Sequence, residues 1–274
     1  MSQPFAQVQG TTYWISIAAI SNNPVVPFNA AWRWQDANRW FYSINCGAAS
    51  SVPGNAWMTV FWNWPEPGQY SDMAFVITSS LNKTLNLKLY LEGLYIGDGY
   101  MHKAQDEYGE HFPGNTADQV TVELHKATNY SIIEYSVDSV NLSIGGNLTI
   151  STIPGSYNGA YYITIRHRNS IETTTALPVP FTGSTISYDF SIAASQAYGD
   201  NQKDVGGGYY AIWGADVNQD GIVDSGDMNP VENESMVVTM DYVPEDVNGD
   251  GIVDSGDMNI VENNSMAVIM VITP

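Results

Sequence analysis

The chain has 274 residues and a formal net charge of −20, with nine Lys and Arg residues against twenty-nine Asp and Glu residues. Such a surface repels nucleic-acid phosphates and no basic stripe offsets the repulsion, which excludes a nucleic-acid-binding protein. The hydrophobic content of 44% suffices for real cores. The one cysteine, Cys46, cannot form an intrachain disulfide and is expected to be buried. No run is apolar for long enough to span a membrane.

The first region, residues 1–80, is expected to be a Trp-rich β-domain. Runs such as TTYWISIAAI and SDMAFVITS are separated by Pro, Gly and Asn turns. Trp32 and Trp34 share one face of a strand, as do Trp62 and Trp64, and exposed tryptophans in a row stack on sugar rings. These four residues are therefore candidates for glycan binding. Filling of a sandwich core is the favoured alternative, and a subunit contact is the third.

The second region, residues 81–209, is expected to be an antiparallel β-sandwich. Apolar residues alternate strictly in LNLKLYLEGLYI, where Leu85, Leu87, Leu89 and Leu91 share one face. The same period recurs in VTVELHKA, VNLSIGGNLTISTI, AYYITIRHRNS and STISYDFSI. Several alternating strands joined by Gly, Pro and Asn turns are typical of sandwiches. A long polar loop from Gly97 to Asp118 interrupts the pattern.

The third region, residues 210–274, contains an acidic repeat. The stretch DVNQDGIVDSGDMNPVENES at 216–235 returns as DVNGDGIVDSGDMNIVENNS at 246–265, with seventeen of twenty positions identical. Residues 214–274 hold thirteen carboxylates and no Lys or Arg. A compact segment of this charge repels itself unless a cation joins it.

Each copy has the spacing of a calcium loop. Side-chain oxygens fall at loop positions 1, 3, 5, 9 and 12, a glycine at position 6, and at position 7 an isoleucine that would donate its main-chain carbonyl. The expected ligands are Asp216, Asn218, Asp220, Ile222, Asp224 and Asp227 in the first loop and Asp246, Asn248, Asp250, Ile252, Asp254 and Asp257 in the second. Calcium accepts six to eight oxygens, whereas zinc prefers nitrogen or sulfur. Two Ca²⁺ ions are therefore expected, the alternative being a pair of solvated acidic turns.

With Asp at position 12 in both copies, residues 216–265 resemble the duplicated calcium loops of dockerins. The resemblance implies a loop and a short helix that occur twice in near-twofold arrangement, a fold held by calcium, and helices that dock on a partner. In that family, loop positions 10 and 11 help to select the partner, and here they are Ser225-Gly226 and Ser255-Gly256.

Upstream, YYITIRHRNSIETT and STISYDFSIAASQAYG, followed by the first loop, resemble the C-terminal region of large secreted surface proteins of Bacteroidetes-type bacteria. That resemblance implies a transthyretin- or CnaB-like sandwich before the dockerin-like end. TTYWISIAAI and SDMAFVIT resemble parts of a jelly-roll-like module. The implied protein is extracellular and modular.

The four histidines form no recognised metal-ligand pattern. His102 and His111 flank Asp106, Glu107 and Glu110, which could make a zinc or further calcium site, although a solvated loop is favoured. His125 and His167 lie in alternating strands and are expected to face outward.

No catalytic motif accompanies these features: G-x-S-x-G, H-E-x-x-H and phosphate-cradling glycine loops are all missing. We therefore expect a non-enzymatic, calcium-stabilised surface protein acting in adhesion or self-assembly, as a fibre or coat subunit. Its expected partners are other protein subunits. The alternative is a carbohydrate-binding appendage of a larger secreted enzyme, with polysaccharide as partner.

Overall fold

The computed structural model describes residues 51–52, 56–57 and 82–274. The chain divides into two compact units, Met1–Thr78 and Ser79–Pro274. In the first unit, strands β1 (Ser51–Val52) and β2 (Ala56–Trp57) pair antiparallel. The other predictions for this unit lie outside the described residues, and they concern Cys46 and the candidate glycan-binding residues Trp32, Trp34, Trp62 and Trp64.

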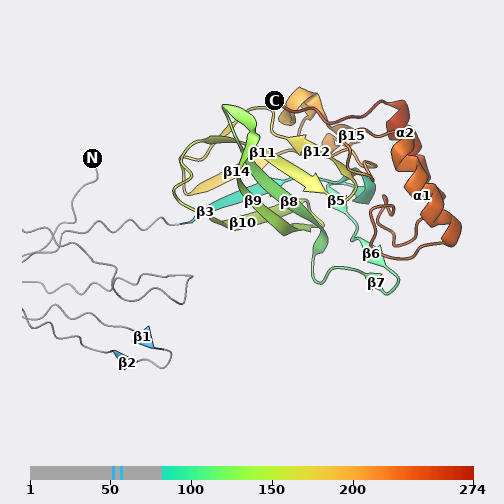
Figure 1. Ribbon diagram of the computed structural model, residues 1–274, viewed down its shortest axis with the longest axis horizontal. Helices are drawn as coiled ribbons and strands as arrows, with labels where there is room; N and C mark the ends of the chain where they lie inside the picture. Colours follow the sequence, from blue (N-terminus) through green and yellow to red (C-terminus); the bar gives the residue numbers. More distant parts are fainter. Residues whose placement is uncertain (1–50, 53–55, 58–81) are drawn as a thin grey trace, which may run out of the picture. The chain divides into compact units, whose positions relative to one another are not determined.

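The second unit is built on two larger sheets (Figure 1). The larger has the order β12-β11-β8-β9, with β13 paired to β11, and the smaller has the order β10-β3-β14. The strands of the larger sheet are β8 (Thr116–Lys126), β9 (Asn129–Ser143), β11 (Ala160–His167), β12 (Ser170–Thr174) and β13 (Val179–Pro180). Those of the smaller sheet are β3 (Lys83–Lys88), β10 (Asn147–Ile153) and β14 (Thr185–Asp189).

The core between these sheets follows from the period-two pattern of the sequence. Leu85 and Leu87 from β3 and Val122 and Leu124 from β8 all belong to one buried cluster. Successive side chains of a strand point to opposite faces, so alternation places one set in the core. The prediction of a mainly β fold with two short helices is confirmed for the described residues.

The antiparallel part of the prediction fails at one strand. β14 pairs with β3 in parallel, with Ile186 opposite Leu85. Parallel neighbours need a long crossover, and here the chain between β3 and β14 forms the whole larger sheet. Local alternation carries no information about the direction of a partner that is separated by so much chain.

Short helical turns and hairpins complete the sandwich part of the second unit. These are η1 (Glu92–Leu94), the hairpins β4–β5 (Tyr95–Gly97, Tyr100–Met101) and β6–β7 (Gln105–Asp106, Gly109–Glu110), η2 (Ala194–Gln196), η3 (Tyr198–Asp200), and the hairpin β15–β16 (Lys203–Gly206, Tyr209–Ala211). The loop expected from Gly97 to Asp118 is thus partly hairpin, and its last residues begin β8.

The repeat forms two helices, α1 (Ser225–Val237) and α2 (Ser255–Met266), which lie side by side at one end of the unit (Figure 1). α1 continues through Pro230. The buried Val231 and Val261 stand at the same position of each copy and belong to a second core, which Ile171 of β12 joins. The repeat therefore packs on the sandwich within one compact unit. No helix among the described residues is long and apolar enough to cross a membrane.

Candidate metal loops and their docking network

The two repeated loops fold alike. In the first, Asn218 Oδ1 accepts a 2.8 Å hydrogen bond from the amide of Asp220, whose Oδ1 accepts a 3.0 Å bond from the amide of Ile222. The second loop repeats both bonds at the same distances. Gly221 and Gly251 at position 6 have φ of 88° and 84°, a left-handed conformation that favours glycine.

The aspartate at position 12 closes each loop and begins each helix. Asp227 Oδ1 accepts from the amides of Val217 (2.7 Å) and Asn218 (3.1 Å), and its Oδ2 accepts from the amide of Asp224 (2.9 Å). Asp224 caps α1 by accepting from the amide of Gly226 at 2.6 Å. Asp224 and Asp227 also form a capping box, in which the side chain of each accepts from the amide of the other. Asp257 and Asp254 do the same for α2. Aspartate, which is shorter than glutamate, suits a residue that both closes the loop and begins the helix.

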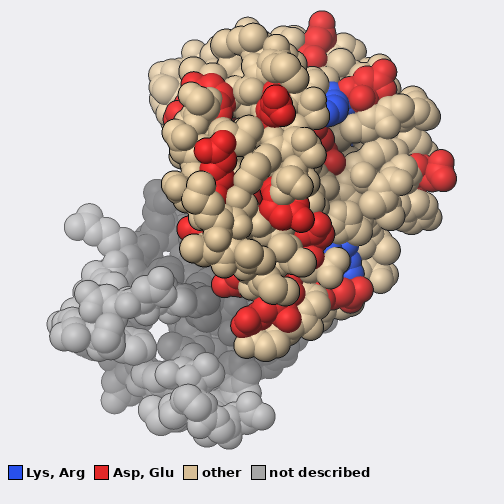
Figure 2. All heavy atoms as spheres, turned by 90° about the vertical axis from the view of Figure 1, so that its right-hand side faces the viewer, with Lys and Arg blue, Asp and Glu red and all other residues tan. Residues whose placement is uncertain are grey.

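Two carboxyls per loop are buried close to other carboxyls. Burial raises the pKa of Asp216 to about 6, and repulsion from Asp227 and Asp220 adds to the effect. Burial raises the pKa of Asp246 to about 7 despite attraction to Arg168. The pKa values of the position 12 aspartates are raised, again chiefly by burial. Figure 2 views the side on which α1 and α2 lie and shows acidic residues spread across it with few basic ones.

The oxygen donors expected at positions 1, 3, 5 and 12 thus lie within one hydrogen-bonded cluster in each loop. The side chains of Ile222 and Ile252 are 44% and 36% exposed. Among the residues that the structure describes, no group of three or more His, Cys, Asp or Glu residues is arranged to hold a metal ion. Calcium loops also use amide and main-chain oxygens, so binding itself has to be measured.

Each loop is clasped by the segment that follows the other helix. The amide of Val223 donates to the carbonyl of Ile269 at 2.9 Å, and the amide of Val253 donates to the carbonyl of Thr239 at 2.9 Å. Both valines are buried. In the first loop the amide of Val271 also donates to the carbonyl of Gly221 at 2.8 Å. The exchange relates the two copies by an approximate twofold arrangement.

The second loop also lies directly against the sandwich. The amide of Gln105 donates to the carbonyl of Gly249 at 3.0 Å. A Cβ on Gly93 would lie 1.9 Å from the carbonyl oxygen of Val247, and one on Gly249 would lie 2.2 Å from Leu94 Cδ2. These glycines permit a backbone approach that other residues would block.

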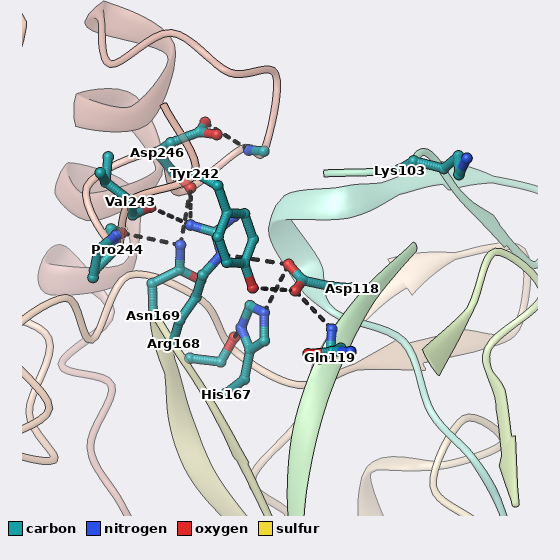
Figure 3. A network of polar contacts seen from close by, with 12 residues as sticks. Lys103, Asp118, Gln119, His167, Arg168, Asn169, Tyr242, Val243, Pro244 and Asp246 are labelled. Atoms are coloured by element: carbon teal, nitrogen blue, oxygen red, sulfur yellow. Dashed lines mark hydrogen bonds and ion pairs between the residues drawn. The ribbon is translucent and has the colours of Figure 1, made fainter. Parts of the chain in front are cut away.

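The segment between α1 and the second loop, residues 238–245, is called the linker. A network of polar contacts centred on Asp118 joins the sandwich to this linker (Figure 3). The hydroxyl of Tyr242 donates to Asp118 at 2.5 Å, His167 Nε2 lies 3.1 Å from the same carboxylate, and Arg168 Nε donates at 3.4 Å. Burial alone would raise the pKa of Asp118, but attraction to His167 and Arg168 outweighs burial and holds the pKa well below its usual range.

Arg168 and Asn169 hold the main chain of the same linker. Arg168 Nη1 donates to the carbonyls of Val243 and Asp246, the latter at 2.8 Å. Asn169 Nδ2 donates to the carbonyls of Pro244 and Asp246, both at 3.0 Å. These two side chains therefore fix the main chain at Asp246, the first residue of the second loop.

The expectation that His125 and His167 face outward is wrong, because both residues are buried. His167 Nε2 lies 3.1 Å from the Asp118 carboxylate and its Nδ1 lies 2.9 Å from Ser170 Oγ. Tyr130 stacks on His125 with ring centroids 4.2 Å apart. His111 is hydrogen-bonded to Asp106 at 2.6 Å and stacks on Tyr242 with centroids 4.2 Å apart.

Sequence reasoning missed Glu92, Asp118, Arg168, Asn169 and Tyr242. Glu92 Oε2 accepts from the amide of Gly214 (2.9 Å) and from Asn264 Nδ2 (2.8 Å), tying the sandwich to α2. One signal was available: the basic run Arg166-His167-Arg168, at the end of β11 and just after it, stands out in a chain with only nine Lys and Arg residues.

Residues 1–78 match a family model described as a domain of unknown function (DUF7901). No curated protein matches the chain. Similar solved structures include a C-terminal and an N-terminal interface mutant of a type II cohesin–X–dockerin complex from Acetivibrio cellulolyticus. The first is 15% identical with a TM-score of 0.40, and the second is 16% identical with a TM-score of 0.39. Each comparison covers 66% of this chain and 94% of the other chain. Likenesses at this level carry no argument about function.

Proposed function

We propose that residues 216–257 form two calcium sites of dockerin-like type. The observation that carries the proposal is the repeated turn of both loops from position 3 to position 7, beside which a buried position 1 carboxyl of raised pKa lies close to further carboxyls. The donor set is oxygen only, which suits a hard cation with loose geometry. Residues 216, 218, 220, 222, 224 and 227, and their counterparts 30 residues later, would hold the ions.

When bound, calcium would supply positive charge and a common centre for these oxygens. The loops contribute the rest by their own bonds. Backbone amides orient the position 12 carboxylate, and the side chain at position 3 fixes the turn toward position 5. Little reorganisation would then be needed on binding.

Isothermal titration calorimetry with CaCl₂ tests this function. The full chain is expected to bind two ions. Asp220→Ala and Asp250→Ala each remove one charged ligand and are expected to leave one strong site, and the double variant none. Glu134→Ala, at an exposed carboxylate of β9 outside both loops, is the matched control and should still bind two. Two unchanged sites in the double variant would overturn the ligand assignment.

We further propose that the chain acts outside the cell in non-catalytic assembly or adhesion, its sandwich being of transthyretin- or CnaB-like type. Support comes from an apolar surface repeated in both copies. Met236, Val238 and Met240, at and just beyond the end of α1, recur 30 residues later as Met266, Val268 and Met270, and all six are 42–78% exposed. Exposed apolar groups rimmed by polar residues favour a protein contact.

Light scattering and electron microscopy with and without calcium test the assembly role. The wild-type chain is expected to form larger species with calcium, and the double variant Met236→Lys/Met266→Lys is expected to remain monomeric. Leu177→Lys is the matched control, since Leu177 is 73% exposed but lies on the sandwich. Equal assembly of all three proteins would contradict the role of this surface. The carbohydrate-binding alternative rests on tryptophans outside the described residues and stays a prediction.

A further inference from the structure

The two loops carry the same expected ligands but are held by different neighbours. The carbonyl of Asp246 accepts from Arg168 Nη1 and Asn169 Nδ2, two side chains of the turn between β11 and β12. The carbonyl of Asp216 instead accepts from Gln219 Nε2 at 2.5 Å, which belongs to its own loop. Gln219 Nε2 also lies 3.3 Å from the carbonyl of Ser170, a longer contact with the sandwich.

The main-chain contacts of the two loops with their neighbours also differ. The second loop receives a hydrogen bond from Gln105 at Gly249, and a Cβ on Gly251 would lie 3.1–3.2 Å from Gln105 and Asp106. The first loop receives a main-chain bond from Val271 of the C-terminal segment at a different position, Gly221. The sandwich also contacts the entry to the first loop, where the amide of Ile171 donates to the carbonyl of Trp213 at 3.0 Å. The position 1 carbonyl, however, is bonded by sandwich side chains in the second loop and by a side chain of the loop itself in the first.

We propose that Arg168 and Asn169 are positioning residues for the second calcium site, so that the affinity of this site depends on these two side chains of the sandwich while that of the first does not. The inference rests on the calcium sites proposed above. It adds that two loops of almost identical sequence are unequal sites within one chain.

The physical basis is preorganisation of the first ligand. Four donated hydrogen bonds fix the main chain from which the Asp246 carboxylate projects. They run from Arg168 to Val243 and Asp246 and from Asn169 to Pro244 and Asp246. Arg168 is itself held by Asp118 and by the ring of Tyr242, whose centroid lies 4.5 Å from Cζ. Loss of groups that orient a metal ligand typically costs about 10–100-fold in affinity.

The charge of Arg168 acts in the opposite direction, because a guanidinium near Asp246 competes with a cation. Arg168→Lys keeps the positive charge and removes the guanidinium, whose Nη1 reaches the carbonyls of Val243 and Asp246 while its Nε reaches Asp118. Asn169→Ala removes two donors without changing any charge. A loss of affinity in both variants would therefore arise from geometry and not from electrostatics.

Calcium titrations of the full chain in two backgrounds separate the sites. Asp220→Ala disables the first site and reports on the second, and Asp250→Ala does the reverse. In the Asp220→Ala background, Arg168→Lys and Asn169→Ala are expected to weaken the remaining site about tenfold or more. In the Asp250→Ala background, both are expected to change affinity less than about twofold. Gln219→Ala is the mirror control and should weaken the first site alone.

Equal losses in both backgrounds, or no loss at the second site, would overturn the inference. Failure of the calcium function itself looks different, since the parent chain would then bind no calcium at all. Circular dichroism and thermal transitions of each variant, recorded without metal, show whether the sandwich is intact. If Arg168→Lys does not fold, Asn169→Ala and Tyr242→Phe decide the question in the same two backgrounds.

Discussion

The hydroxyl of Tyr242 donates a 2.5 Å hydrogen bond to the carboxylate of Asp118, a residue 124 positions earlier in the chain. Asp118 is fully buried, so a side chain of the linker between the two acidic loops reaches a buried group of the sandwich. Arg168 and His111 lie against the tyrosine ring. The linker is thus an anchored part of the fold.

Tyr242→Phe is expected to lower the free energy of unfolding by about 1.5–3 kcal/mol, because a hydrogen bond to a charged, buried group is lost. Urea denaturation in calcium measures the change. Tyr108→Phe is the control, since Tyr108 is 90% exposed and its change should stay within about 0.5 kcal/mol. Equal effects of the two substitutions would contradict the anchoring role.

Val231→Ala and Val261→Ala are expected to destabilise the protein by similar amounts, about 1.5–3 kcal/mol each, through lost burial and a cavity. Both side chains are fully buried at equivalent positions of the second core. Val237→Ala, at a residue that is 72% exposed, is expected to have little effect. If one core valine tolerated alanine and the other did not, the two copies would not share a core.

The stability of the metal-free protein is expected to fall as the pH rises from about 4 to about 7. The raised pKa values of Asp216 (about 6) and Asp246 (about 7) mean that the folded state keeps protons that the unfolded chain loses near 3.8. Thermal denaturation should therefore give a higher midpoint at pH 5 than at pH 8.

Excess calcium is expected to reverse that order, because the ion needs the deprotonated carboxylates. The lowered pKa of Asp118 does not interfere: its contribution is present above the unfolded value and is lost only as the pH falls through the folded value. A metal-free protein that is more stable at pH 8 than at pH 5 would contradict the assignment of buried, mutually repelling carboxyls.

Chelation is expected to open the repeat before the sandwich. Without calcium, repulsion among the loop carboxylates remains, and a segment with few large apolar residues has little burial to offset it. Limited proteolysis with and without EDTA should give cleavage after residue 216 in EDTA and leave residues 82–209 resistant. Equal protection of the repeat in both samples would show that docking to the sandwich suffices without the ion.

The core of the sandwich could be predicted because its signal is local. Leu85, Leu87, Leu89 and Leu91 were expected on one face, and all four are buried. The parallel pairing of β14 with β3 could not be predicted, since about a hundred residues separate the two strands and periodicity gives no partner.

The signal for the loop ligands was also local, because one spacing rule defines their positions. The residues that surround the loops come from distant parts of the chain and could not be predicted in this way. The burial of His167 depends on Asp118 and on a linker that lies beyond β12 in the sequence. Arg168 and Asn169 were not identified, since their targets are main-chain carbonyls, which leave no trace in the sequence of the linker.

The exchange of main-chain hydrogen bonds between the copies determines the shortest segment of this repeat that could fold by itself. Val223 of the first loop is bonded to Ile269, and Val253 of the second to Thr239. A chain cut after Met266 would retain every expected calcium ligand and both helices, yet its first loop would lose the segment that closes it. Duplication has therefore made the two copies mutually dependent halves, and neither is a spare for the other.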